Sequence, residues 1–440
     1  FISYGLSNIV FAALFGIVFM MLLKRFDMSS ESRLICLNIA MGLHLVPVFS
    51  NYNNLDYGSV MFVQNGAYVL KTIIALLIMI MMIDLARGKR VFILGIITAF
   101  LLFWTSISSG FWLFSTAVVP LIIYRAYIFM CDKKLKELVK DKAFRILTGF
   151  ALICVAGQII MTYVLGNSTI DSSMRIINTF RFWGNIGTMI VAFFRIVGGM
   201  TTARMNILSA GGVCVSLYFV LTVLLIVAGG FVTKKKRNEK PEHQIILSVF
   251  WGNLILFTIC DTRWGDDNFS YRYLIVAFLI TVICLGLFLD DVLYEKWGRG
   301  FLVISMAVCL LAVNTYSFLL IYNEKNNYED LMEMAEFFDS KDPEVVLFYG
   351  DKTVYVDGRN LRVLDLTKVY KTVLTGDDFP THIGDTLKYD YDYEGSYIIV
   401  SKKDDFNSLP AHVREGSSVL SEDLKGYYVV QYDGSIPEFF

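Results

Sequence analysis

The sequence predicts a polytopic α-helical membrane protein of about ten spans that ends in a small α/β domain. Of its 440 residues, 55% are hydrophobic and 15% aromatic, and the mean hydropathy is +0.56, which no ordinary soluble domain shows. Several apolar runs reach the roughly 20 residues that a helix needs to cross the hydrocarbon core. The two parts of the chain differ in charge. From Glu324 onward there are 12 Lys+Arg and 24 Asp+Glu, whereas the residues before it contain 27 Lys+Arg and 16 Asp+Glu.

This contrast predicts two domains, a basic membrane domain over 1–322 and an acidic α/β domain over 323–440. All seven cysteines fall in or beside apolar runs of the first domain, so neither a disulfide framework nor a metal-binding spacing is present. The chain begins with Phe1, already close to an apolar run, and we expect its natural N-terminus to lie further upstream.

The apolar runs predict ten spans, at about 4–23, 34–50, 66–86, 91–107, 111–130, 146–165, 208–230, 245–260, 274–289 and 301–321. Lysine and arginine concentrate in alternate connections, which hold Lys24, Arg25, Arg33, Arg87, Lys89, Arg90, Lys133, Lys134, Lys136, Lys140, Lys142, Arg145, Lys234, Lys235, Lys236, Arg237, Lys240, Lys296 and Arg299. The positive-inside rule makes these connections cytoplasmic. The acidic domain is then extracytoplasmic, at a cell membrane.

Four segments are predicted on the outer side. Asn51–Asn65 is polar and contains Asp56, and Ser108–Gly110 forms a tight turn. Gly166–Ile207 contains an apolar run, Ile186–Val197, that is too short to span, so we expect helices lying in the interface there. The fourth is Asp261–Tyr273.

Ionisable residues inside spans are few and therefore candidates for function. His44 lies in the outer half of the second span, where it either serves a site or bonds to a neighbouring helix. Lys71 lies close enough to the outer end of its span that we expect it to extend to the surface.

The segment Asp261–Tyr273 has the densest polar chemistry, with Arg263, Arg272, Asp261, Asp266 and Asp267 beside a Trp/Tyr cluster. Such a set could hold a charged head group at the mouth of a helical bundle. The alternative is a solvated connection whose Arg, Trp and Tyr side chains anchor at the lipid interface.

In the acidic domain, apolar spacing predicts a helix over Tyr328–Phe338. Strands are predicted at Val345–Tyr349, Arg362–Leu366, Ser396–Ser401 and Tyr427–Gln431. Gly350-Asp351-Lys352 lacks the spacing of a phosphate-binding loop, and nothing here forms a catalytic constellation.

Together, the many spans with short basic connections, the interfacial helices, and the Arg272-Tyr273-Leu274 entry into a late span resemble the GT-C superfamily of membrane glycosyltransferases. These include aminoarabinose transferases and protein O-mannosyltransferases. The resemblance is one of architecture and covers most of the chain. It implies that Arg272, with Tyr273 as companion, binds the phosphate of a polyprenyl-phosphate sugar donor, and it allows a divalent cation (Mg or Mn) as cofactor.

The family places its catalytic Asp or Glu in the first outer loop, so the resemblance also implies that this loop and the first span precede Phe1. The catalytic residue is then unknown, and the substrate-binding candidates in this chain are Arg272, Tyr273, Arg263, Asp266, Asp267, His44 and Asp56. The partners implied are the lipid bilayer and the polyprenyl-phosphate donor, with no nucleic acid. The competing hypotheses are a transporter, which the lack of repeats and of midplane charges disfavours, and a non-enzymatic scaffold whose acidic domain binds a partner.

Overall fold

The structure is a computed structural model of the whole chain. It describes residues 2–42, 57–58, 61–62, 68–164, 177, 179–200, 206–236, 239–260, 272–292, 296–323, 327–343, 345–351, 353–354, 357–358, 361, 368–374 and 395–436. The chain divides into two compact units, of which one comprises Ile2–Ile321 and the other Tyr322–Phe440 together with Phe1.

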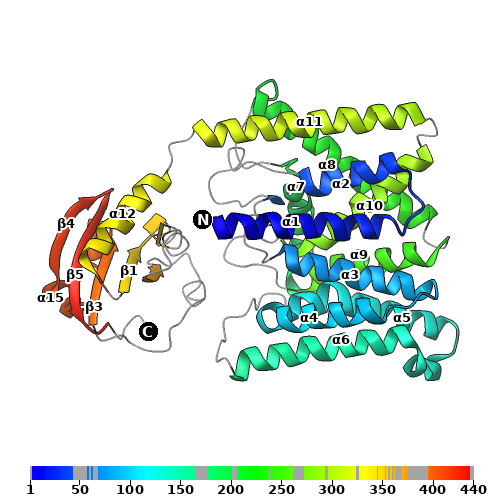
Figure 1. Cartoon of the computed structure of the whole chain (residues 1–440), viewed down its shortest axis with the longest axis horizontal. Helices are drawn as coiled ribbons and strands as arrows, with labels where there is room; N and C mark the ends of the chain where they lie inside the picture. The colour runs from blue at the N-terminus through cyan, green and yellow to red at the C-terminus, as the bar shows by residue number, and fades with distance from the viewer. Residues whose placement is uncertain are drawn as a thin grey trace. The chain divides into compact units, whose positions relative to one another are not determined.

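The first unit is helical throughout its described residues. Its helices are α1 (Ile2–Leu23), α2 (Ser30–Gly42), α3 (Val69–Ala86), α4 (Phe92–Leu113), α5 (Val119–Cys131), α6 (Lys142–Ile159), α7 (Phe182–Val197), α8 (Ala210–Lys235), α9 (Pro241–Ile259), α10 (Ile275–Val292) and α11 (Lys296–Asn323). Short 3₁₀ and π segments join them, namely η3 (Phe114–Val118), η4 (Leu135–Lys140), η5 (Ile160–Val164) and η7 (Thr179–Arg181). Helices α1, α3, α4 and α6 lie side by side (Figure 1).

Within the described residues, eight helical segments are long and apolar enough to cross a membrane. Seven coincide with predicted spans, and they contain α1, α3, α5, α6, α8, α9 and α10. The eighth, Thr179–Val197, contains α7, which the sequence analysis assigned to the interface because it counted only Ile186–Val197. Two other predicted spans correspond to shorter apolar helical parts, Phe92–Ile107 in α4 and Gly300–Val313 in α11. Helix α2 covers the first part of the predicted span 34–50, whose remainder lies outside the described residues. The predicted class, a polytopic helical membrane protein, is confirmed.

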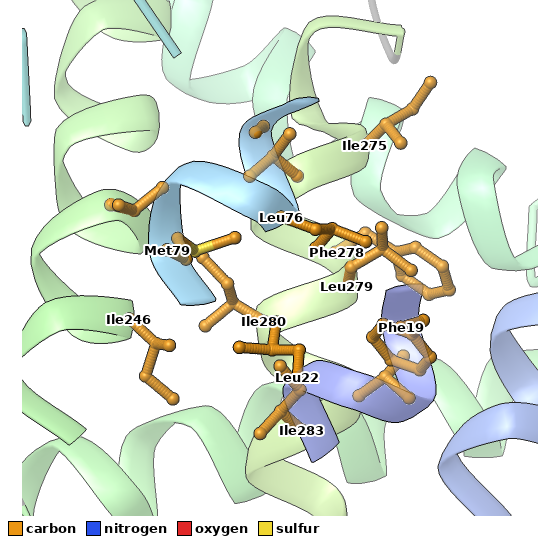
Figure 2. Close-up of a cluster of buried hydrophobic side chains, with 14 of the residues drawn as sticks. Phe19, Leu22, Leu76, Met79, Ile246, Ile275, Phe278, Leu279, Ile280 and Ile283 are labelled. Carbon is orange, nitrogen blue, oxygen red and sulfur yellow. The ribbon is translucent and has the colours of Figure 1, made fainter. Parts of the chain in front are cut away.

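Helices α3 and α10 form the interior of this unit, with 83% and 89% of their spanning residues buried. Both are apolar around their whole circumference, which suits helices that expose no side to water. Figure 2 shows Leu76 and Met79 of α3 packed with Phe278 and Ile280 of α10 in one cluster. Because α10 is central, its first residues are held more firmly than those of a peripheral helix.

Peripheral helices expose apolar stripes instead. Along α4, the exposed residues Phe92, Ile96, Phe100 and Trp104 recur at intervals of four. Comparable rows run along α1, α6 and α8. Apolar surface of this extent is unstable in water and marks contact with lipid. This helical unit is therefore a multi-pass membrane domain.

The chain reverses between α4 and α5 although helical hydrogen bonding continues through η3. A Cβ added to Gly95 would lie 3.7 Å from Met81 Sδ, so the start of α4 is next to the end of α3. Tyr124 of α5 lines a cavity together with Met82, so it too lies at this end. A straight helix would separate Gly95 from Tyr124 by about 43 Å, at 1.5 Å per residue. The predicted tight turn at Ser108–Gly110 is wrong, because these residues lie within α4 and the chain reverses without a break in helical hydrogen bonding.

The second unit is a three-layer α/β domain. Its elements are α12 (Asn327–Lys341), β1 (Val345–Gly350), β2 (Val369–Leu374), β3 (Gly395–Ser401), α14 (Lys403–Phe406), α15 (Ala411–Gly416), β4 (Ser418–Leu424) and β5 (Tyr427–Gly434). The strand order is β2-β1-β3-β5-β4, in which β1 pairs in parallel with β2 and β3, and β5 is antiparallel to β3 and β4. One face packs on α12 through Phe338 and the other contacts Leu409 and Val413, next to α14 and α15.

The predicted helix at Tyr328–Phe338 and three of the four predicted strands coincide with α12, β1, β3 and β5. The predicted strand Arg362–Leu366 lies outside the described residues, whereas β2 and β4 were missed. Strand β4 lies at the edge of the sheet and half of it is exposed, so its residues lack the apolar alternation that identifies a strand. A two-residue turn, with φ of 55° at Lys425 and 89° at Gly426, connects it to β5.

Candidate functional site

The sequence analysis proposed seven substrate-binding residues, and the structure describes two of them. Arg272 and Tyr273 lie at the entry to α10. The remaining five lie outside the described residues, namely His44, Asp56, Arg263, Asp266 and Asp267. The site is therefore built from Arg272, Tyr273 and the described residues that surround the start of α10.

Arg272 and Tyr273 belong to a single 3₁₀ turn that continues into α10. Tyr273 is 1% exposed and Arg272 is half-buried. Arg272 Nη2 donates a hydrogen bond to the Tyr273 hydroxyl at 2.9 Å, and the guanidinium carbon lies 4.9 Å from the centre of the Tyr273 ring. These two contacts orient the guanidinium at the N-terminal end of a helix, where the helix dipole also favours an anion.

Two other predicted outer segments reach the same part of α10. Tyr57, from the segment Asn51–Asn65, is fully buried and donates a hydrogen bond to the Ala40 carbonyl at 2.8 Å. Its ring lies 5.2 Å from that of Phe278, and the Phe193 ring of α7 lies 6.4 Å from Phe278. Residues from three predicted outer segments therefore converge on the first turns of α10.

Helix α7 also contacts the end of α9. The buried Asn185 amide donates to the Thr258 carbonyl at 3.1 Å and to the Cys260 carbonyl at 2.9 Å, at the end of α9. Ile177 forms a β-bridge with Cys260. The two described residues on either side of 261–271 are therefore both held in place. Cys260 is held by Asn185 and Ile177, and Arg272 is held by Tyr273.

Helix α7 contacts three neighbouring helices. It touches the end of α9 through Asn185, the start of α10 through Phe193 and the first half of α8 through Phe194, whose ring lies 5.0 Å from that of Phe219. Trp183 is exposed on it. An interfacial location for α7 remains a prediction.

Lys71 lies at the same end of the unit, and the expectation that it reaches the surface is wrong. Its side chain is buried at 8% exposure, with Nζ 4.7 Å from the centre of the Tyr68 ring. Leu76 and Phe278 lie together in the core, and α3 and α10 run in the same direction (Figure 2). Lys71 and Tyr273 each precede these residues by five positions, about 7.5 Å along a helix. A buried lysine therefore lies at about the depth of Tyr273.

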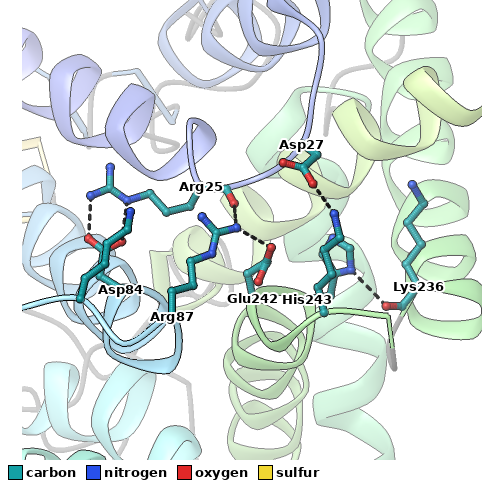
Figure 3. Close-up of polar contacts among 9 residues, drawn as sticks. Arg25, Asp27, Asp84, Arg87, Lys236, Glu242 and His243 are labelled. Atoms are coloured by element: carbon teal, nitrogen blue, oxygen red, sulfur yellow. Dashed lines mark hydrogen bonds and ion pairs between the residues drawn. The ribbon is translucent and has the colours of Figure 1, made fainter.

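The opposite end of the unit gathers the basic connections. Figure 3 shows the contacts that join them, in which Arg25 pairs with Asp84 at 2.7 Å, Arg87 pairs with Glu242 at 2.5 Å, and Lys240 pairs with Asp27. Lys236 also pairs with Asp291 at 2.6 Å. Connections far apart in sequence thus meet at one end, as the positive-inside argument requires. Their cytoplasmic location remains a prediction.

This arrangement can bind an anion through the half-buried Arg272, with the buried Lys71 as a second cation at this end of the unit. Sequence reasoning wrongly expected Lys71 at the surface, and it did not single out Tyr57 or Asn185. An asparagine within an apolar helix is one available signal, because burial of an amide without hydrogen bonds is costly. Among the described residues no cluster of three His, Cys, Asp or Glu could hold a metal ion. The proposed divalent cation is therefore not assigned to any residues.

No family model and no curated protein matches the chain. A solved structure that does match is that of ArnT from Cupriavidus metallidurans bound to undecaprenyl phosphate. The TM-score is 0.52 at 12% sequence identity, and the match covers 97% of this chain and 83% of that one. At this identity the match establishes the fold. The chain therefore has an ArnT-like membrane fold.

Proposed function

We propose that this protein is a membrane glycosyltransferase that transfers a sugar from a polyprenyl-phosphate donor to an acceptor on the outer face of the membrane. The main support is the structural match to ArnT, which extends over 97% of the chain and whose structure contains undecaprenyl phosphate. The oriented guanidinium of Arg272 adds support from the chain itself, because it presents a positive group where the resemblance places the donor phosphate.

In this proposal Arg272 binds the phosphate of the donor. A guanidinium donates paired hydrogen bonds that match phosphate oxygens, and such charge-assisted bonds are about twice as strong as neutral ones. The contact with Tyr273 restricts the guanidinium before the donor arrives, so less side-chain entropy is lost on binding. Lys71 supplies a second positive charge at the same depth.

The resemblance implies an inverting transfer, in which Arg272 contacts the phosphate that leaves. A general base removes the proton of an acceptor hydroxyl, and the hydroxyl oxygen attacks the anomeric carbon of the sugar. The bond between that carbon and the phosphate oxygen breaks with inversion, and the lipid phosphate leaves with an additional negative charge. Arg272 stabilises this developing charge, which is the main electrostatic contribution that the described residues can make.

The general base is not assigned, because the outer carboxylates Asp56, Asp261, Asp266 and Asp267 all lie outside the described residues. The sugar and the acceptor are left open. We propose that the acidic domain is extracytoplasmic.

Binding of undecaprenyl phosphate to the purified protein in lipid nanodiscs tests the proposal. Arg272→Ala removes charge-assisted hydrogen bonds worth about 1.5–3 kcal/mol, so affinity should fall roughly 10- to 100-fold. Arg181→Ala is the matched control, because Arg181 is an exposed arginine of the adjacent η7 segment and is outside the site. Equal affinities for Arg272→Ala and the unmodified protein would refute the phosphate role.

Turnover is measured separately, as the release of free polyprenyl phosphate from a labelled polyprenyl-phosphate sugar. We expect release in membranes that contain the unmodified protein and loss of release with Arg272→Ala at normal expression. Binding of the lipid phosphate without release from any donor of a panel would instead favour a non-enzymatic lipid-binding protein.

A further inference from the structure

A cavity of about 210 Å³ lies between α3, α5, α6 and α9, at the end of the membrane domain that carries the basic connections. Its walls are mostly apolar, and they include Met82, Leu85, Leu121, Leu147 and Ile245. This site is remote from Arg272, because Met82 and Leu85 lie in the last turn or so of α3 whereas the Arg272 site faces its first turn. A cavity with apolar walls is better filled by hydrocarbon than by water.

The polar residues of the cavity all lie toward the end of the bundle. Lys142 is the first residue of α6 and Arg125 lies at the middle of α5, and Leu147 and Leu121 lie about one turn deeper along these helices. Tyr124 donates a hydrogen bond to Gln244 of α9 at 2.6 Å. The cavity therefore has an apolar inner part and a polar mouth.

The mouth is positively charged. Arg125 Nη2 and Nε donate to the two carboxylate oxygens of Asp141 at 2.7 and 3.1 Å, and Asp141 also accepts from the Phe144 amide at 2.8 Å as the N-cap of α6. These bonds neutralise Asp141. Lys142 is exposed beside them and leaves the lining with a net positive charge.

The adjacent η4 segment has the composition of an element that lies in a membrane surface. Leu135 and Val139 are exposed, Leu138 is buried, and the neighbouring lysines Lys134, Lys136 and Lys140 are exposed. Apolar side chains among lysines favour contact with anionic head groups while the apolar groups enter the hydrocarbon boundary. This segment therefore places the mouth of the cavity at the level of lipid head groups.

We infer that the cavity is a binding site for an anionic phospholipid of this leaflet. The head-group phosphate contacts Lys142 and the outer edge of Arg125, and the first part of an acyl chain enters the apolar inner part. The proposed ligand is a membrane lipid and not a soluble phosphate, because the apolar walls of the cavity suit an acyl chain. This inference is independent of the proposed transferase reaction and concerns the opposite end of the domain.

Lipid retention by the purified full chain tests this inference, with native mass spectrometry after reconstitution in phosphatidylglycerol or phosphatidylcholine. We expect phosphatidylglycerol to be retained preferentially. Lys142→Gln should lower that retention about fivefold, since one basic residue near an anionic surface contributes a factor of about five to binding. Lys136→Gln is the matched control, because it removes the same charge from the same connection but does not line the cavity.

A second variant acts on the apolar part. Ala86 lines the cavity and is exposed, so Ala86→Leu adds volume at the cavity without disturbing a buried neighbour. We expect it to lower retention of phosphatidylglycerol while the melting temperature in detergent stays unchanged. Equal effects of Lys142→Gln and Lys136→Gln would overturn the inference in favour of diffuse surface attraction. Competition by inorganic phosphate, or equal retention of both lipids, would overturn it as well.

Discussion

The hydrogen bonds of Asn185 give a quantitative test of how α7 supports the outer site. Its amide nitrogen donates to two backbone carbonyls, those of Thr258 and Cys260, and the side chain is 1% exposed. Asn185→Asp keeps the shape but replaces the donor with a carboxylate oxygen. Both carbonyls then lose their donor and face a negative charge, so α7 should separate from the end of α9.

The expected loss can be worked from these two bonds. Each hydrogen bond contributes about 0.5–1.5 kcal/mol, and leaving a buried carbonyl unsatisfied costs about 1–3 kcal/mol. We therefore expect Asn185→Asp to reduce the free energy of unfolding by about 2–4 kcal/mol. For a unit of this size the melting temperature should fall by roughly 3–8 °C. Binding at the Arg272 site should weaken as well, because Cys260 begins the segment that leads to it.

Differential scanning fluorimetry of the purified protein measures the change, and Asn206→Asp provides the control. Asn206 is exposed, and its side-chain oxygen accepts from the Leu208 amide at 3.0 Å, a bond that aspartate retains. The control should therefore keep the melting temperature of the unmodified protein. The reasoning is refuted if Asn185→Asp melts within a degree of Asn206→Asp.

Two further predictions concern packing and charge. Gly157 of α6 lies against α4, where an added Cβ would meet Ser106 Oγ at 1.9 Å, so Gly157→Ala should cost about 1–3 kcal/mol of stability. The control Gly149→Ala, where an added Cβ has nothing within 4 Å, should increase stability by up to about 1 kcal/mol. Equal melting temperatures of the two variants would contradict the close approach of α6 and α4 at Gly157. In the acidic domain, burial raises the pKa of Asp351, but hydrogen bonds from Lys402 and from the Val354 and Thr353 amides outweigh it and hold the pKa below its ordinary value of 3.8. This stabilisation is present above that ordinary value and is lost as pH falls through the lowered pKa. Amide-exchange protection of β1, corrected for intrinsic rates, should thus drop below pH 4 in the unmodified protein and show less pH dependence in Asp351→Asn.

The membrane class and most helix positions followed from the sequence because hydrocarbon imposes a local requirement. A span needs a continuous apolar run, and a run such as that of α10 is visible without knowledge of its neighbours. The alternation of basic connections is likewise a property of short segments, and the ion pairs between Arg25 and Asp84 and between Arg87 and Glu242 agree with it.

The length of α7 was less predictable from the sequence. Polar residues interrupt its first half, so a count of consecutive apolar residues detects only its second half. The sequence also missed β2 and β4. Strand pairing depends on residues distant in sequence, and the register of β4 with β5 contains irregularities that an alternating pattern cannot reveal.

Some residues of the site could likewise be identified from the sequence, and others could not. Arg272 and Tyr273 were identifiable because a charged residue at the start of a span is conspicuous in an apolar sequence. The burial of Lys71 was not, since a lysine near the end of a helix extends to the surface unless neighbouring segments enclose it. The sequence by itself determined which segments enter the membrane. Only the tertiary structure decided that Tyr57 and Phe193 pack against Phe278 in the first turns of α10, because helix packing is a property of side chains brought together from separate segments.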